Sequence, residues 1–129
     1  MATEIVFTDD GRGVIIAHTG IVNGEDVVSA LQSVMADSRY PTVKYWISDR
    51  TGCTKYDVST EQVTEIAKNT RAARNLNPSL LVALVSPSAL QFGISRMLQN
   101  LTDEELSTTL VCESRDEADA WIIEQLNRA

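Results

Sequence analysis

Histidine and cysteine are scarce in this chain of 129 residues, which has one histidine and two cysteines. Cys53 and Cys112 match neither the spacing of a redox pair nor that of a zinc site. His18 falls in a predicted strand, where a lone histidine is more often a structural residue than a catalytic base. We therefore predict two reduced thiols, no metal site and no cofactor.

Basic residues are also in the minority, with 11 Lys and Arg against 18 Asp and Glu, a formal net charge of −7. This charge repels phosphate backbones and anionic membrane surfaces. No apolar run approaches the ~20 residues that a helix needs to cross a bilayer. The start Met1-Ala2-Thr3-Glu4 lacks the basic residues of a signal peptide. We therefore predict a cytoplasmic protein that neither binds nucleic acid nor inserts into a membrane.

The motifs of the common enzyme classes are missing as well. The chain has no Gly-x-Ser-x-Gly elbow, no glycine-rich phosphate loop and no His-Glu-x-x-His helix. We therefore expect no catalytic residues and a protein that is not an enzyme.

The residues that are present suit one globular domain covering 1–129. Hydrophobic residues make up 43% of the chain and charged residues 22%, without a linker or an internal repeat. Strands are predicted at residues 4–8, 13–19, 44–48, 80–85 and 107–112. Asp10-Gly11 between the first two predicts a hairpin. The unbroken apolar run over 80–85 is typical of a strand buried on both faces.

Four side chains that can cap a helix predict four helix starts, at Asn23, Ser59, Ser86 and Ser114. Pro87 directly after Ser86 suits the first position of a helix. An acidic turn is expected over residues 102–105. The helix that follows Ser86 carries apolar residues at helical spacing, which predict its buried face. These residues are Leu90, Ile94, Met97, Leu98 and Leu101.

The resulting order β-β-α-β-α-β-α-β-α predicts an α/β fold, with a five-stranded, mixed, mostly parallel sheet and four helices. If the strands lie in sequential order, right-handed crossovers place the helices on one face and leave the other face thinly covered. Alternation along a strand puts Trp46 on the face opposite to Tyr45 and Ile47. We expect the exposed face to mediate self-association, and hence a homodimer.

Three local patterns, together with this element order, carry a resemblance to a known family. They are Trp46-x-x-Asp49-x-x-Gly52, then Val85-x-Pro87-Ser88-x-x-x-Phe92-Gly93-x-x-Arg96-Met97, and Ala118-x-Ala120-Trp121-Ile122. The chain resembles the SpoIIAA-like family of small bacterial proteins, relatives of the sulfate transporter and anti-sigma-factor antagonist (STAS) domains. STAS antagonists carry a phosphorylatable serine where the helix after the third strand begins. The resemblance implies that Ser59 is that serine.

Ligands of open α/β sheets usually bind at the carboxyl ends of the strands. The candidate ligand or partner site at that edge consists of Asp49, Arg50, Gly52, Ser86, Ser88, Gly93 and Arg96. Each also has a structural interpretation. The serines cap helices, Asp49 pairs with Arg96, and Gly93 allows a backbone or ligand to approach closely.

Two functions remain open. The first is a non-catalytic, STAS-like regulatory or binding module that acts through protein contacts, with Ser59 as its phosphorylation site. The second is a carrier for a lipid or acyl-like ligand, with Phe92, Met97 and Met35 as adaptable lining.

Overall fold

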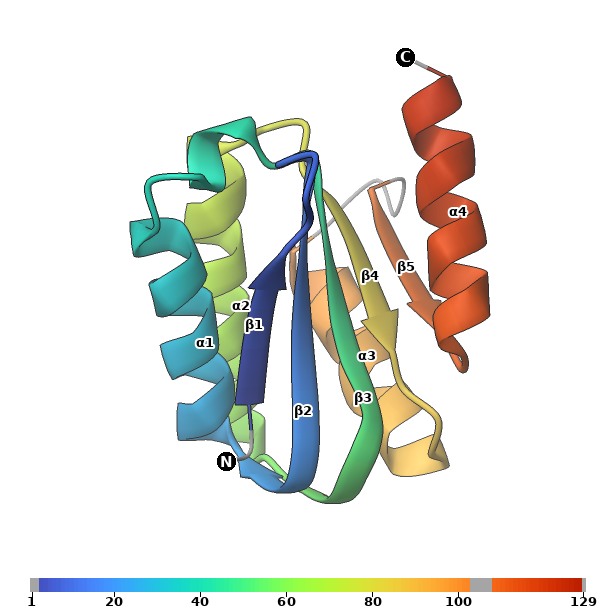
Figure 1. Cartoon of the computed structure of the whole chain (residues 1–129). Helices are drawn as coiled ribbons and strands as arrows, with labels where there is room; N and C mark the ends of the chain where they lie inside the picture. Colours follow the sequence, from blue (N-terminus) through green and yellow to red (C-terminus); the bar gives the residue numbers. More distant parts are fainter. Residues whose placement is uncertain (1–2, 103–107, 129) are drawn as a thin grey trace.

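The structure is a computed structural model that describes residues 3–102 and 108–128 (Figure 1). Its elements are β1 (Thr3–Phe7), β2 (Gly13–Asn23), α1 (Gly24–Ala36), the 3-10 turn η1 (Tyr40–Thr42), β3 (Tyr45–Asp57), α2 (Thr60–Leu76), β4 (Leu81–Val85), α3 (Ala89–Thr102), β5 (Thr109–Cys112) and α4 (Arg115–Asn127). The predicted order of strands and helices is confirmed. Residues 103–105 of the expected acidic turn, and Ser107 of the expected last strand, lie outside the described residues.

The five strands form one sheet in the sequential order β1-β2-β3-β4-β5. β1 is antiparallel to β2, and the other neighbours are parallel. Sequential parallel strands joined by crossovers of one hand carry their helices on one face. Accordingly, α1, α2 and α3 share one face, which we call the three-helix face, and α4 lies on the other (Figure 1). The second face is therefore better covered than the sequence predicted.

The two faces of the sheet have separate apolar cores, as strand alternation requires. Trp46 packs with the helices of the three-helix face. Ile47, the next residue of β3, packs with Ala118 and Ile122 of α4. Tyr45 lies on the same side as Ile47, so the predicted division of these three residues is confirmed.

β2 and β3 are both longer than predicted. The segment Asp49-Arg50-Thr51-Gly52, which resembles a turn, continues β3 to Asp57 and pairs with the extended β2. Register shifts after Ala17 and after Gly20 accommodate the pairing, and Gly20 has a positive φ of 69°. Cross-strand pairing with β2 outweighs the turn-like local composition.

The helix starts at Asn23, Ser59 and Ser114 are confirmed, since each side chain accepts a hydrogen bond from the backbone three residues later. The predicted start at Ser86 is wrong. Its backbone N–H still donates to the Cys112 carbonyl, 2.8 Å away, as part of the sheet. The helix begins at Ala89 and is capped by Ser88, whose Oγ accepts from the backbone of Gln91 at 3.1 Å.

Candidate functional site

α3 turns a polar stripe toward the sheet and much of its apolar surface toward solvent. Gln91, Ser95 and Gln99, spaced four residues apart, are all buried, together with Ile94 and Leu98. The largest apolar residues on the opposite side are Leu90, Met97 and Leu101, which are 64%, 42% and 45% exposed. The prediction that these three point inward is wrong.

Arg50 explains this orientation. Its side chain lies on the three-helix face and is 1% exposed. Nη1 donates to Ser95 Oγ at 2.7 Å and to Ser86 Oγ at 3.4 Å, and the two hydroxyls are 2.6 Å apart. The guanidinium also lies over the Tyr56 ring, 4.9 Å from its centroid. A buried guanidinium needs acceptors, and a wholly apolar helix face would supply none.

Polar contacts also hold the C-terminal end of α3. Gln99 Nε2 donates to the carbonyl of Thr109 at 2.9 Å. Arg71 of α2 donates to the carbonyl of Leu101, and Arg74 to that of Thr102, each at 3.0 Å. The last carbonyls of a helix have no partner within it, so these arginines cap α3 from its neighbour.

A small cavity of about 20 Å³ lies between the sheet and the three helices. Its lining is mostly apolar, with six polar side chains: His18, Ser48, Arg50, Thr70, Thr102 and Thr109. A space of this size accepts about one water molecule. The candidate lining of the carrier hypothesis lies elsewhere, because Met35, Phe92 and Met97 do not line it.

His18 is buried beside this cavity and stays neutral at physiological pH. Burial first, and then the positive charge of Arg50, lower its pKa to about 4, while Asp26 and Asp49 act in the opposite direction. Nδ1 of the ring lies 3.1 Å from Thr3 Oγ1. His18 therefore has a structural environment rather than that of a general base poised near pH 7.

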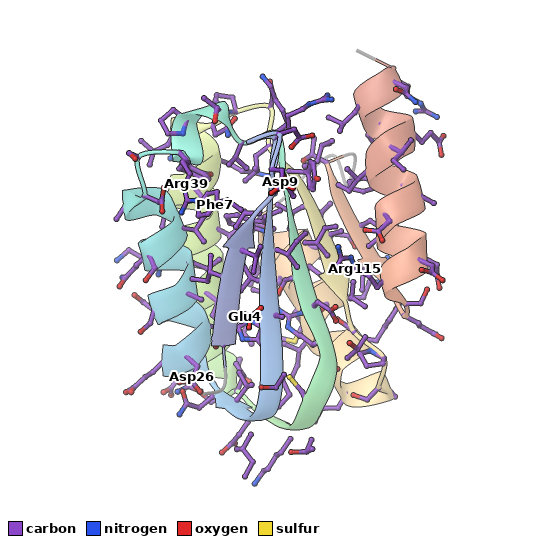
Figure 2. The ribbon with its side chains drawn as sticks, in the orientation of Figure 1. Glu4, Phe7, Asp9, Asp26, Arg39 and Arg115 are labelled. Carbon is purple, nitrogen blue, oxygen red and sulfur yellow. The ribbon has the colours of Figure 1, made fainter. Side chains whose placement is uncertain are left out.

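The predicted pairing of Asp49 with Arg96 is wrong. Strand alternation places Asp49 on the face of α4, where its carboxylate accepts from Thr51 and lies 3.9 Å from Arg115. Arg115 reaches over the sheet from the start of α4 (Figure 2). Arg96 is exposed, donates to Gln99 and lies 5.8 Å from the Phe92 ring centroid. The two residues therefore belong to different sides of the molecule.

Three of the predicted site residues meet at an open depression of about 380 Å³ beside the start of α3. Ser86, Ser88 and Gly93 line it, together with Phe92 and Glu113. A Cβ added at Gly93 would meet no atom within 4 Å, so packing within the described chain does not require a glycine there. The described residues that line this depression include no histidine or lysine to activate a serine, and no hydrogen bond among them pairs Glu113 with either hydroxyl, so the arrangement of a nucleophilic site is not formed there.

The remaining predicted positions have structural roles. Ser59 is exposed and caps α2 through a reciprocal pair of hydrogen bonds with Gln62. Gly52 lies opposite Thr19 in β2, and a Cβ there would come within 2.9 Å of the Thr19 methyl group. Close packing of the two strands therefore favours glycine at this position.

Neither thiol is activated as a nucleophile. Cys53 and Cys112 are free and pack against opposite faces of the sheet. Burial raises the pKa of both, that of Cys112 to about 11, which disfavours the reactive thiolate. Over residues 3–102 and 108–128, no cluster of His, Cys, Asp and Glu is arranged to hold a metal ion. In the same residues, no helix has the length and apolarity needed to cross a membrane.

The sequence reasoning missed the partners of Arg50, which are Ser95 and Tyr56, and the buried glutamines Gln91 and Gln99. A signal was present, because Gln91, Ser95 and Gln99 recur at i, i+4 and i+8 and so mark one polar helix face. Arg50, which the sequence placed in the candidate ligand or partner site at the edge of the sheet, has its side chain in the core.

The fold and site thus define an α/β domain whose least usual feature is a buried arginine network under α3. No protein-family model, curated protein or solved structure matches the chain. The resemblance to STAS domains therefore stays a prediction from the sequence patterns.

Proposed function

We propose that the chain is a STAS-like, non-catalytic binding module, and that a protein partner docks on the outer face of α3. We define this outer face by Leu90, Met97 and Leu101. The observation that carries the proposal is that these side chains are 64%, 42% and 45% exposed while polar residues of the same helix are buried. Exposed apolar residues clustered on one element are typical of an interaction surface.

The charge around the outer face favours an acidic, amphipathic partner segment. α3 contains no acidic residue and carries the exposed Arg96, and Arg71 of α2 lies against its C-terminal end. The chain as a whole has a formal net charge of −7, whereas α3 itself carries one arginine and no acidic residue. Complementary charge steers a partner to its site and suppresses incorrect partners. A symmetric contact between two copies of α3 would instead oppose Arg96 to itself.

Ser59 is the proposed phosphorylation site of this module. It is exposed at the N-terminus of α2, where a phosphate would meet free backbone N–H groups and the positive end of the helix dipole. The support is its accessible position and the resemblance to STAS antagonists. Intact-mass analysis of protein isolated from the producing cells, with Ser59→Ala as the control, tests the modification.

Homodimerisation is a separate proposal that uses the face of α4. Val6 and Ile123 are 47% and 60% exposed on this side, where a groove of about 300 Å³ is lined by Ile15 and Ile123. Native mass spectrometry of the wild type and Ile123→Glu tests it. A dimer in the wild type that dissociates in the variant is the expected result, and a wild-type monomer would contradict it.

The docking proposal is tested with Met97→Glu and a matched control, Ile21→Glu, which places the same charge at an exposed apolar residue of β2. The tagged proteins are cross-linked in cells, and partners retained by the wild type are then purified and measured by calorimetry. We expect Met97→Glu to weaken binding more than tenfold, Met97→Lys to weaken it less because the partner is acidic, and Ile21→Glu to bind normally. Equal binding by the wild type and Met97→Glu, or binding only to anionic vesicles, would contradict the proposal.

The alternative function is a carrier for a lipid or acyl-like ligand. The mostly apolar cavity beside Arg50 favours it, because an acyl chain with a carboxylate head would find both an apolar lining and a cation. The cavity of about 20 Å³ requires α3 to move before such a ligand enters. Native mass spectrometry of freshly purified protein tests this function, and a spectrum without retained small molecules counts against it.

A further inference from the structure

Arg50 carries a buried charge without an ionic partner in the described part of the chain. The ion pairs found over residues 3–102 and 108–128 involve the arginines at 39, 115 and 128. Arg50 instead has two neutral serine hydroxyls. Burying a guanidinium is unfavourable unless a counter-charge and hydrogen bonds compensate it.

The hydrogen-bonding capacity around Arg50 is also incomplete. Arg50 Nε and the Tyr56 hydroxyl are both buried without a hydrogen-bond partner, and the guanidinium lies over the Tyr56 ring. Native proteins rarely leave such donors unsatisfied. Arg50 Nε can donate to an anion, which would also neutralise the charge of Arg50.

The adjoining cavity limits the size of such an anion. Arg50 is one of its lining residues, and its volume is about 20 Å³. This suits one particle of about the size of a water molecule and excludes a phosphate ester or a long acyl chain in the observed arrangement. His18 lines the same cavity and does not compete as a cation, because it is neutral.

We propose that the cavity binds a small monovalent anion, of the size of chloride, against Arg50. The anion stabilises the polar underside of α3 by compensating the charge of Arg50. This site is independent of the partner-binding function, since it lies beneath α3 and the docking surface lies on its outer side.

His18 is a natural reporter because it is the single histidine of the chain. The charges acting on it are those of Arg50, which lowers its pKa, and of Asp26 and Asp49, which raise it. An anion beside Arg50 offsets the first of these effects. Its binding should therefore raise the pKa of His18.

The experiment follows the His18 ring signals by NMR as the pH is varied, in sodium chloride or sodium methanesulfonate at equal ionic strength. Methanesulfonate stays ionised throughout the titration and is too large for the cavity. We expect the pKa of His18 to be about one unit higher in chloride than in methanesulfonate. Arg50→Met should remove the difference between salts, and Arg39→Met, which deletes an exposed arginine, should retain it.

Identical His18 titrations in the two salts would overturn the proposal, as would a salt difference that persists in Arg50→Met. If Arg50→Met does not fold, wild-type crystals grown in sodium bromide show whether an anion binds beside Arg50. Anomalous scattering from bromide beside Arg50 Nε supports the site, and the absence of a peak there overturns it. Loss of partner binding alone would leave this result unaffected, so the two proposals fail separately.

Discussion

α2 and α3 follow neighbouring parallel strands, cover the same face of the sheet and are both capped by serine, yet they bury different kinds of side chain. α2 buries mainly apolar residues, including Val63, Ile66 and Ala67. α3 buries Gln91, Ser95 and Gln99 beside Ile94 and Leu98. The difference lies in what each helix meets on the sheet, because Arg50 requires hydrogen-bond acceptors from α3. The orientation of a helix thus depends on the residues beneath it as well as on its own apolar pattern.

The largest expected effect distinguishes the inner face of α2 from the outer face of α3. Ile66→Ala should lower the free energy of unfolding by about 3 kcal/mol, because it leaves a cavity at a residue that is 2% exposed. Met97→Ala should change it by less than about 0.5 kcal/mol, because Met97 is largely solvated. Chemical denaturation of both variants measures the difference. Equal losses would mean that α3 is oriented as its apolar pattern predicts.

The next effect concerns the polar contacts that hold α3. Ser95→Ala should cost about 2 kcal/mol of unfolding free energy, since it removes the shorter hydrogen bond of the buried Arg50.

A double-mutant cycle with Arg50→Met isolates this contact. In the Arg50→Met background, Ser95→Ala should lower the free energy of unfolding much less than in the wild type. The coupling energy between the two residues should be about 1 to 2 kcal/mol. Additive effects of the two substitutions would show that the Arg50–Ser95 bond does not stabilise the native state.

The polar interior also predicts a pH dependence that an apolar interior lacks. The pKa of His18 is about 4 in the folded protein, below its ordinary value of 6.5. Protonation of His18 therefore favours the unfolded chain. The contribution of neutral His18 to the free energy of unfolding is complete above pH 6.5 and is lost as the pH falls toward 4. Between about pH 7.5 and about pH 5 the loss should be about 2 kcal/mol. Denaturation in His18→Asn should lack this part of the pH dependence.

The smallest expected effect is the loss of a helix cap, which should lower the free energy of unfolding by about the same amount in α2 and α3. Ser59→Ala and Ser88→Ala each remove a side-chain cap and should each cost about 1 kcal/mol, measured by thermal unfolding. The corresponding glycine variants should cost only a few tenths of that. If Ser88→Ala were neutral, the assigned start of α3 would be wrong.

The sequence predicts the fold well where local signals and the final structure agree. Asp10-Gly11 indicates the hairpin, alternation separates Trp46 from Ile47, and the capping side chains at Asn23 and Ser59 mark true helix starts. Each of these signals acts within a few residues of the feature it specifies.

The site is less predictable because its contacts are distant in sequence. Arg50 lies in a polar run that resembles a turn, and only pairing with β2 makes the run a strand that points Arg50 into the core. Ser86 resembles a helix cap until its backbone pairs with β5. Ser95, 45 positions after Arg50, then becomes its partner. Pattern reading within single segments cannot combine these three non-local facts.

The central claim is that α3 presents its apolar side to solvent in the free protein. Its most direct test is oxidation of the purified native protein by hydrogen peroxide, followed by mass spectrometry of the methionine-containing peptides. Met97, which is 42% exposed, should be oxidised faster than Met35, which packs against the core, and the protein should stay folded. Protection of Met97 equal to that of Met35 would contradict the claim.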